Sequence, residues 1–411
     1  MGRMQLFCKC LLFCCLAALY SLLALASDGD LAICAGAKVY PSPTDPPIEN
    51  AVLFIQDGKL NLVADGNRLK IPFPASAKQL DCRGKFIVAG FWNSHVHFEI
   101  SWADAAKQPA GQLESHMQEM LTKWGVTTAW DLGSVPTNTM TIRKRVESGE
   151  VPGPQILMAG DIFPKGGHPA YLPAEMQLPE AATPDDALRM AHGYFFLGLD
   201  GIKLFTGSYM GPGKPVVNMD TSLVAVVGEL THAMHRPLFA HPQNRTGVDN
   251  ALNGGVDILA HTIPTEGSFT PAELEQMKRQ HTALIPTLTL WTTVVSDKKI
   301  QQQLVQAGVD ETKAFLANGG MVLFGTDVGF QTVYDTTLEY EYMGRAMSWK
   351  QILASLTTNP ALEFSAPSKG RVEKDMDADL VALDADPAAD VKNFARVAWT
   401  MRKGKLIYEK K

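Results

Sequence analysis

The chain has 411 residues, of which 46% are hydrophobic and 19% charged, and its formal net charge is −6. This composition is typical of a globular protein, and the length favours a large domain, such as an α/β barrel of about 250 residues, with a smaller second one. The negative balance argues against nucleic acid and anionic membranes as partners. It leaves a small-molecule substrate and a homo-oligomer possible.

Residues 1–26 predict a secretory signal peptide. Arg3 and Lys9 are followed by the apolar run "LLFCCLAALYSLLALA", which ends in small residues up to Ala26. The alternative is an uncleaved membrane anchor, but the run is short of the ~20 residues that span a bilayer. We expect cleavage after Ala26, export to the periplasm or the medium, and no stable membrane partner for the mature chain.

Two cysteines remain after that cleavage. Cys34 and Cys82 lie outside the leader, whereas the other four cysteines lie within it. An oxidising compartment permits a disulfide between the two, but the sequence does not fix the distance between their Cα atoms. A disulfide and two free thiols both stay open at this point.

Both ends of the mature chain consist of short apolar stretches broken by turns. Asp57-Gly58 and Asp65-Gly66 are hairpin signals near the N-terminus, and Lys403-Gly404 marks a turn near the C-terminus. We therefore expect residues 27–88 and 367–411 to build one composite β-sandwich domain.

The segment 89–366 alternates between strand-like and helix-like stretches. This pattern predicts a (β/α)8 barrel. A doubly wound open sheet is the alternative, but no glycine-rich fingerprint follows the first strand. The eight expected strands cover residues 85–97, 126–132, 155–162, 201–207, 236–242, 256–262, 282–289 and 321–327.

Metal-ligating residue types gather at the predicted carboxyl ends of these strands, where barrels place their active sites. A period of two puts His95 and His97 on the same face of the first strand. Each residue alone is weak evidence, but together they predict a site for zinc or a similar divalent ion. The set comprises His95, His97, Lys203, His241, His261 and Asp327.

In these residues and their order, the chain resembles the amidohydrolase superfamily. "TTNPA" at 357–361 and the following "GRVEKDMDADLVALDADP" also match, and "KGGHP" at 165–169 resembles a Gly-Gly-His loop of the imidazolonepropionase-like and Xaa-Pro dipeptidase-like members. Imidazolonepropionase itself has no lysine that bridges two metal ions, so Lys203 argues against that activity. Two departures from the family pattern are Asn93, where many members have Asp, and Pro169.

The resemblance implies a binuclear metal centre, with Zn²⁺ as the expected ion. His95, His97 and Asp327 would bind one ion, His241 and His261 the second, and Lys203 would bridge both as a CO2-derived carbamate. A metal-bridging hydroxide would attack an amide carbonyl. Asp327 would transfer the proton to the leaving nitrogen, and His261 is the second residue expected to be catalytic.

Three residues outside the ligand set are candidates for substrate binding: His168, Tyr209 and Arg245. His168 would contact substrate above the metals, and Arg245 could pair with a substrate carboxylate. The alternatives are that His168 is an ordinary loop histidine and that Arg245 is an ordinary surface arginine, neither of which contacts substrate. The remaining histidines outside the strand ends have no role in this prediction; they are His116, His192, His232, His235 and His281.

The sequence therefore predicts an exported, metal-dependent hydrolase of amide or peptide bonds in dipeptides or N-acyl amino acids. The alternatives are an esterase, lactonase or phosphotriesterase on the same centre, and a barrel that binds ligands without catalysis.

Overall fold

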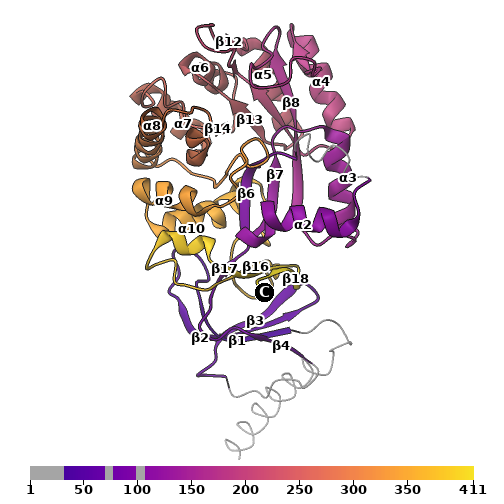
Figure 1. Ribbon diagram of the computed structural model, residues 1–411, viewed down its shortest axis with the longest axis vertical. Coiled ribbons are helices and arrows are strands. Elements are labelled where there is room, and N and C mark those ends of the chain that lie inside the picture. Colours follow the sequence, from indigo (N-terminus) through magenta and orange to yellow (C-terminus); the bar gives the residue numbers. More distant parts are fainter. Residues whose placement is uncertain (1–31, 70–76, 99–106) are drawn as a thin grey trace, which may run out of the picture.

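The computed structural model describes residues 32–69, 77–98 and 107–411 (Figure 1). The predicted signal peptide, residues 1–26, lies outside the described residues. The chain forms a parallel α/β barrel, and a second sheet built from both ends of the chain lies beneath it in Figure 1. The expected fold class is confirmed.

The barrel sheet contains seven parallel strands in the order in which they follow one another along the chain. An eighth segment, residues 321–328, lies between the first and the last of them. The backbone N–H of Leu323 bonds to Leu284 O (2.9 Å), and that of Ser94 bonds to Phe324 O (2.7 Å). This segment nearly closes the barrel. The seven strands are β6 (Phe91–Val96), β7 (Val126–Asp131), β8 (Gln155–Pro164), β10 (Gly201–Phe205), β13 (Leu238–His241), β14 (Ile258–Ala260) and β15 (Ala283–Ile285).

Helices follow the strands and surround them (Figure 1). Five of them are α2 (Ala110–Met120), α4 (Pro184–Phe196), α5 (Thr221–Ala233), α7 (Pro271–Gln280) and α8 (Lys298–Ala317). The others are α3 (Pro136–Glu147), α6 (Arg245–Asn253), α9 (Thr337–Ala346), α10 (Trp349–Leu356) and α11 (Thr358–Glu363). Short 3-10 turns are η2 (Thr122–Trp124), η3 (Leu288–Thr292) and η4 (Val391–Ala395), and short strands are β9 (Glu180–Ala181), β11 (Gly207–Ser208) and β12 (Val217–Asn218).

The first expected strand, residues 85–97, is two strands in the structure. β5 (Phe86–Ala89) belongs to the second sheet, and β6 begins the barrel. Gly90 separates them, and a Cβ there would lie 2.3 Å from Thr127 Oγ1. The close approach of β7 therefore requires glycine at the point where the chain passes between the two sheets.

The second sheet joins strands that are more than 300 residues apart in the chain. Its order is β18 (Lys405–Glu409), β17 (Val397–Arg402), β16 (Leu380–Leu383), β5, β1 (Ala32–Val39), β2 (Ile48–Gln56) and β3 (Lys59–Asp65), with β4 (Lys78–Asp81) also on β1. Cys34 and Cys82 form a disulfide in its buried core. This sheet contacts the amino end of the barrel, where Thr400 Oγ1 donates to Thr122 O at 2.7 Å.

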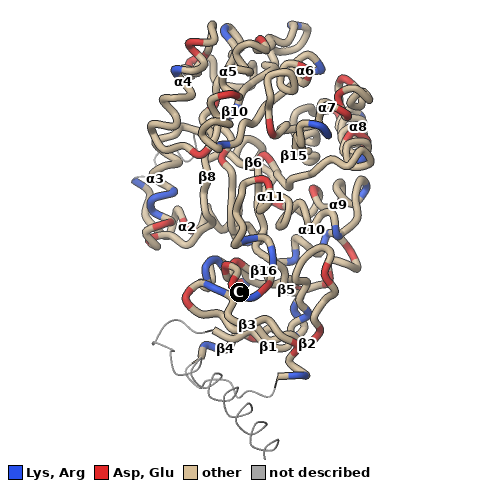
Figure 2. Tube along the Cα trace, turned by 180° about the vertical axis from the view of Figure 1, so that it is seen from behind, with Lys and Arg blue, Asp and Glu red and all other residues tan. Residues whose placement is uncertain are grey.

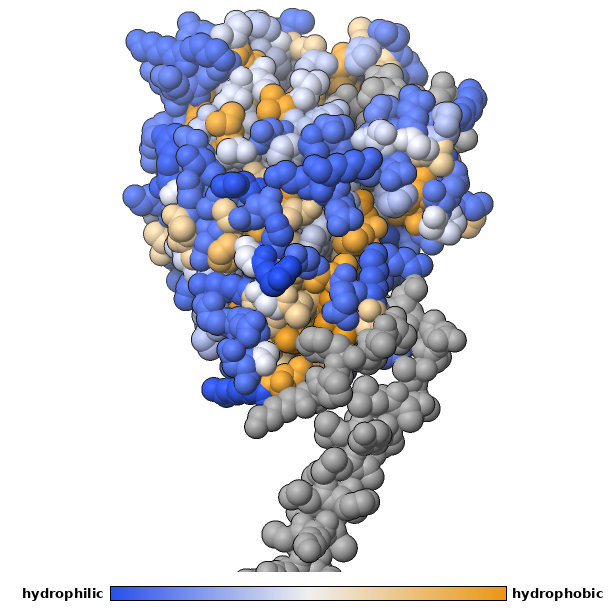
Figure 3. Space-filling view, turned by 60° about the horizontal axis from the view of Figure 1, so that its bottom comes forward, coloured by the Kyte–Doolittle hydropathy of each residue, from blue (hydrophilic) through white to orange (hydrophobic). Residues whose placement is uncertain are grey.

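Basic and acidic residues are interspersed along the described chain (Figure 2). Seen from the side of the second sheet, hydrophilic residues cover most of the surface, and apolar ones form a band next to the residues drawn in grey (Figure 3). Among the described residues, no helix is long and apolar enough to cross a membrane.

Candidate metal centre

The predicted metal ligands come together at the carboxyl end of the barrel. His95 lies on β6 and His97 directly follows it, and their Nε2 atoms lie 3.2 Å and 2.9 Å from Asp327 Oδ1. The two Nε2 atoms are 3.2 Å from each other. Three donor atoms from two segments more than 200 residues apart therefore face one point.

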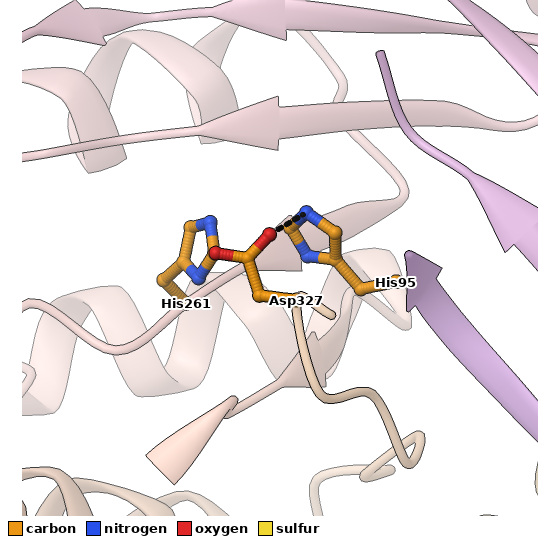
Figure 4. Close-up of side chains that lie close together, drawn as sticks. All are labelled: His95, His261 and Asp327. Atoms are coloured by element: carbon orange, nitrogen blue, oxygen red, sulfur yellow. Dashed lines mark ion pairs between the residues drawn. The ribbon is translucent and has the colours of Figure 1, made fainter. Parts of the chain in front are cut away.

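The remaining ligands lie beside these three. The ring centroid of His261 is 4.7 Å from that of His95 and 4.8 Å from that of His241. One ligand atom each of His95, His261 and Asp327 lie within 4.8 Å of one another, and Figure 4 shows the three side chains pointing together. This group combines members of both predicted ion sites, so the two sites are adjacent.

Hydrogen bonds on the outer side of the rings assign their tautomers. His97 Nδ1 lies 2.6 Å from the carbonyl oxygen of Gly133, which only accepts, so Nδ1 carries the hydrogen. His261 Nδ1 lies 2.6 Å from Thr287 Oγ1, whose own hydrogen is donated to Pro286 O. The Nε2 of each ring is therefore the nitrogen directed into the site. Histidine ligands of metals are typically held in this way.

These tautomers make the centre fit a cation. The Nε2 of His97 faces the Oδ1 of Asp327 at 2.9 Å, and this pair requires a positive charge, either a metal ion or the second proton of His97. Burial lowers the pKa of His97, but the hydrogen bond and the charge of Asp327 outweigh it and raise this pKa to about 9, so a metal ion would take the place of that proton. Asp327 Oδ1 is buried, and its near neighbours include the Nε2 atoms of His95 and His97. Ligands at 2.0–2.1 Å from a tetrahedral zinc ion lie roughly 3.3 Å apart, close to the distances found here.

The backbone is strained where the ligands stand. His261 and Asp327 have φ angles of 79° and 60°, and Thr287, which holds the His261 ring, has a φ of 46°. Non-glycine residues seldom adopt this left-handed region, and where they do they cluster at functional sites. Here the turn aims each side chain inward directly after its strand.

Lys203 lies on β10 and is 1% exposed. Burial lowers the pKa of its amine to about 7, although the negative charges of Asp327 and Asp161 act in the opposite direction. Its positive charge in turn lowers the pKa values of His95 and His241, after the larger effect of burial. The amine is therefore near enough to both halves of the centre to interact with each, and is partly neutral near pH 7.

His241 and Asn93 are held by further side chains. His241 Nε2 lies 3.1 Å from Gln243 Oε1, which leaves Nδ1 as the free ring nitrogen. Asn93 donates to Thr326 Oγ1 at 2.7 Å, and its Oδ1 accepts from the backbone N–H of His95 and of Thr326. Asn93 thus ties the strand of His95 to the segment that carries Asp327.

Two aspartates of the site were missed at the sequence level, the buried Asp131 and the half-buried Asp161. Asp131 ends β7 and accepts hydrogen bonds from Gly133 N and from the hydroxyls of Ser134 and Thr139, which fixes the loop whose carbonyl holds His97. Asp161 on β8 is paired in register with Lys203. Burial, and then the charge of Asp131, raise the pKa of Asp161 to about 6. The strand ends "AWD" and "AGD" were the available signal.

Tyr171 is a third missed residue. It follows the Gly-Gly-His-Pro segment, packs edge-on against Phe330 with ring centroids 5.1 Å apart, and is 39% exposed. Burial of the hydroxyl, and then the negative charges of Asp327 and Asp161, raise its pKa. The hydroxyl therefore lies near the metal ligands and stays protonated.

His168 and Tyr209, two of the predicted substrate-binding residues, form hydrogen bonds with backbone groups of the loops. His168 Nδ1 and Nε2 each lie 3.2 Å from a carbonyl oxygen of its own loop, those of Pro169 and Met176. Tyr209 is half-buried, and its carbonyl accepts from Ala170 N at 2.8 Å, which joins the loops after β8 and β10.

Arg245 is occupied by the protein itself. Its guanidinium bonds to Glu273 Oε2 at 2.6 Å and to the carbonyl oxygens of Glu266 and Ser268 at 3.1 Å. These contacts tie α6 to α7 and favour the alternative reading of Arg245 as a structural residue.

Residues 86–407 match the model of the amidohydrolase family. The chain belongs to the amidohydrolase family. It is accordingly a hydrolase of carbon–nitrogen bonds. No curated protein matches this amidohydrolase.

Solved structures share the fold of this amidohydrolase. A protein from Bifidobacterium longum assigned as a prolidase is 23% identical with a TM-score of 0.77, over 92% of this chain and 95% of that one. A Xaa-Pro dipeptidase with methionine bound in its active site is 20% identical with a TM-score of 0.78, over 92% of this chain and 100% of that one. The ochratoxinase of A. niger is 18% identical with a TM-score of 0.73, over 93% of this chain and 96% of that one.

Proposed function

We propose that this amidohydrolase cleaves an amide or peptide bond in small substrates, with dipeptides or N-acyl amino acids as the substrate class. The observation that carries the proposal is the convergence of His95, His97, His261 and Asp327 at the carboxyl end of the barrel, with the rings of His97 and His261 held by outward hydrogen bonds. Two relatives in fold, a prolidase and a Xaa-Pro dipeptidase, are named for the hydrolysis of such bonds.

Two divalent ions, most simply zinc, would be held by the predicted ligands. His95, His97 and Asp327 would hold one, His241 and His261 the second, and the carbamate of Lys203 would lie between them. Bound ions of this kind supply an activated water and a Lewis acid for the carbonyl oxygen. The partly neutral amine of Lys203 supports the carbamate, because only a neutral amine reacts with CO2.

The chain's own groups would move the proton and orient the substrate. Asp327 is 3% exposed and can accept a proton on its carboxylate and deliver it to the leaving nitrogen. The hydroxyl of Tyr171 stays protonated beside Asp327 and is suited to donate a hydrogen bond to the substrate. Lys203 and Asp161 lie next to each other on neighbouring strands and set the charge of the site floor.

We further propose that the mature enzyme acts outside the cytoplasm. The charged and apolar pattern of residues 1–26 and the Cys34–Cys82 disulfide support this location, because disulfides persist in oxidising compartments. A fusion of the first 26 residues to a reporter that is active only after export would test it.

The substrate class is tested with the purified, metal-loaded enzyme on a panel of dipeptides, N-acyl amino acids, lactones and phosphotriesters. We expect kcat/KM to be highest for a dipeptide or an N-acyl amino acid. Hydrolysis of lactones or phosphotriesters without amide cleavage would overturn the substrate assignment. Binding of amides without turnover would indicate a barrel that lost its catalysis.

A further inference from the structure

A cavity of about 410 Å³ opens at the amino end of the barrel. Its wall includes the residues that directly precede three strands: Asp200 before β10, Pro237 before β13 and Asp257 before β14. The metal centre lies at the opposite ends of these parallel strands, roughly 10–15 Å away at 3.3 Å per residue. The volume is within the range of small-molecule sites.

Aromatic rings form the inner wall of this cavity. Phe364, which follows α11, packs on Trp130 with ring centroids 4.9 Å apart and on Trp92 at 5.6 Å. Trp130 lines the cavity and is 2% exposed, yet its indole N–H has no hydrogen-bond partner among the described residues. The nitrogen is enclosed by protein, so the Trp130 ring contributes an apolar wall to the cavity and its N–H signal can report on a ligand that packs on the ring.

The charged groups of the rim differ in how they are paired. Asp200 binds Arg143 at 2.7 Å, and Asp257 accepts from His232 Nε2 at 2.9 Å. Glu363 forms no hydrogen bond or ion pair with the residues that the structure describes. Burial, and then the charge of Asp257, raise the pKa of Glu363 to about 7. A cation would therefore be attracted to Glu363 and Asp257.

We infer that this cavity is a second binding site, for a small molecule with a primary ammonium group and an apolar body. The ammonium group donates to Glu363 and Asp257, and the apolar body packs on Trp130 and Phe364. Arg236, which also lines the cavity with its guanidinium 3.9 Å from Asp200, is placed to receive a carboxylate if the ligand is an amino acid. The inference does not depend on the proposed substrate.

Nuclear magnetic resonance of the metal-loaded enzyme with ¹⁵N-labelled tryptophan tests this site. The indole signal of Trp130 is assigned with Trp130→Phe and followed during titration with phenethylamine, phenylalanine and 3-phenylpropionate. We expect the two ammonium-bearing probes to shift this signal at lower concentration than 3-phenylpropionate, which lacks the ammonium group and should bind at least about tenfold more weakly. Tighter binding of phenylalanine than of phenethylamine would identify an amino acid as the ligand, and the reverse a simple amine.

Glu363→Gln is the decisive variant, and the exposed Glu341→Gln on α9 is its matched control. Loss of the charged acceptor should weaken both ammonium-bearing probes about tenfold or more, whereas Glu341→Gln should bind them like the wild type. Both variants should retain turnover, because neither residue contacts the metal centre, and this also verifies folding. Unshifted Trp130 with every probe, or equal binding by Glu363→Gln and the wild type, would overturn the inference.

Discussion

The two ends of the barrel treat their buried polar groups in opposite ways. At the carboxyl end, the Nδ1 atoms of His97 and His261 are held by outward hydrogen bonds, and the Nε2 of His97 faces Asp327. At the amino end, Asp200 and Asp257 are paired with cationic or N–H groups of the protein, and Glu363 alone among the described carboxylates of that rim is unpaired.

The difference shows what each end requires from outside. Several acceptors that face one another are stable only around cations, so the carboxyl end is built to be completed by metal ions. The amino end is close to neutral by itself and has room for one additional charge. Changes at the carboxyl end should therefore affect catalysis, and changes near the amino end should affect binding or stability.

Asp327→Asn is the change with the largest expected effect. The amide keeps the shape but is a poor metal ligand and cannot accept the proton, so kcat/KM should fall about 10²–10⁴-fold. Steady-state kinetics on the best substrate of the panel measures this, and Asp310→Asn, on the exposed side of α8, should leave kcat/KM unchanged. Activity of Asp327→Asn within a few-fold of the wild type would remove Asp327 from the mechanism.

Removal of the disulfide is expected to affect stability and not catalysis. Cys34 and Cys82 are 48 residues apart, and closure of a loop of this length stabilises the fold by up to about 4 kcal/mol. Cys34→Ala combined with Cys82→Ala should lower the melting temperature and leave kcat/KM of the folded enzyme unchanged. If turnover fell while the melting temperature held, the second sheet would have a catalytic role that this account does not give it.

Thr287→Val tests the hydrogen bond that holds the ring of His261. Valine has nearly the same shape and is also β-branched, so the backbone strain at φ 46° stays similar, but it cannot accept from Nδ1. Metal affinity or activity should fall about 10–100-fold. Competition with a chelator measures the affinity. Thr293→Val is the control, because the Thr293 hydroxyl bonds within its own turn, to Leu290 O. Equal losses of metal affinity in both variants would argue against the tautomer assigned to His261.

The smallest expected effect concerns pH and stability. Glu311 on α8 is fully buried, its Oε2 accepts from Ile263 N, and burial raises its pKa to about 8. Because the folded pKa lies above the unfolded one, the neutral acid stabilises the fold at low pH, and this contribution is lost as the pH rises from about 4.5 through 8. Glu311→Gln should therefore reduce the decline in melting temperature between about pH 6 and about pH 9, while the exposed Glu275→Gln should not.

The sequence predicted which side chains come together at the rim because strand geometry places them. Residues two apart on a strand share a face, and parallel strands end at one rim, so His95, His97 and Asp327 could be brought together without knowledge of the loops. The split of residues 85–97 was not foreseen, because it depends on how closely Thr127 approaches Gly90.

Roles that depend on loops and neighbouring helices were harder to predict. The fork of Arg245 binds Glu273 on the next helix, a contact that no local pattern announces. The loop after β8 brings Tyr171 close to Asp327, although neither its length nor its course follows from the strand pattern. Asp131 was visible at the end of a strand, but its function became clear only from the loop that it fixes.

The most direct test of the central claim is the number of metal ions per chain in the wild type and in Lys203→Met, each loaded with zinc in the presence of bicarbonate. Elemental analysis should find two ions in the wild type and fewer in the variant, with loss of amide hydrolysis in parallel. A metal-free chain that still hydrolyses its substrate, or a variant that binds as many ions as the wild type, would contradict the proposed binuclear centre.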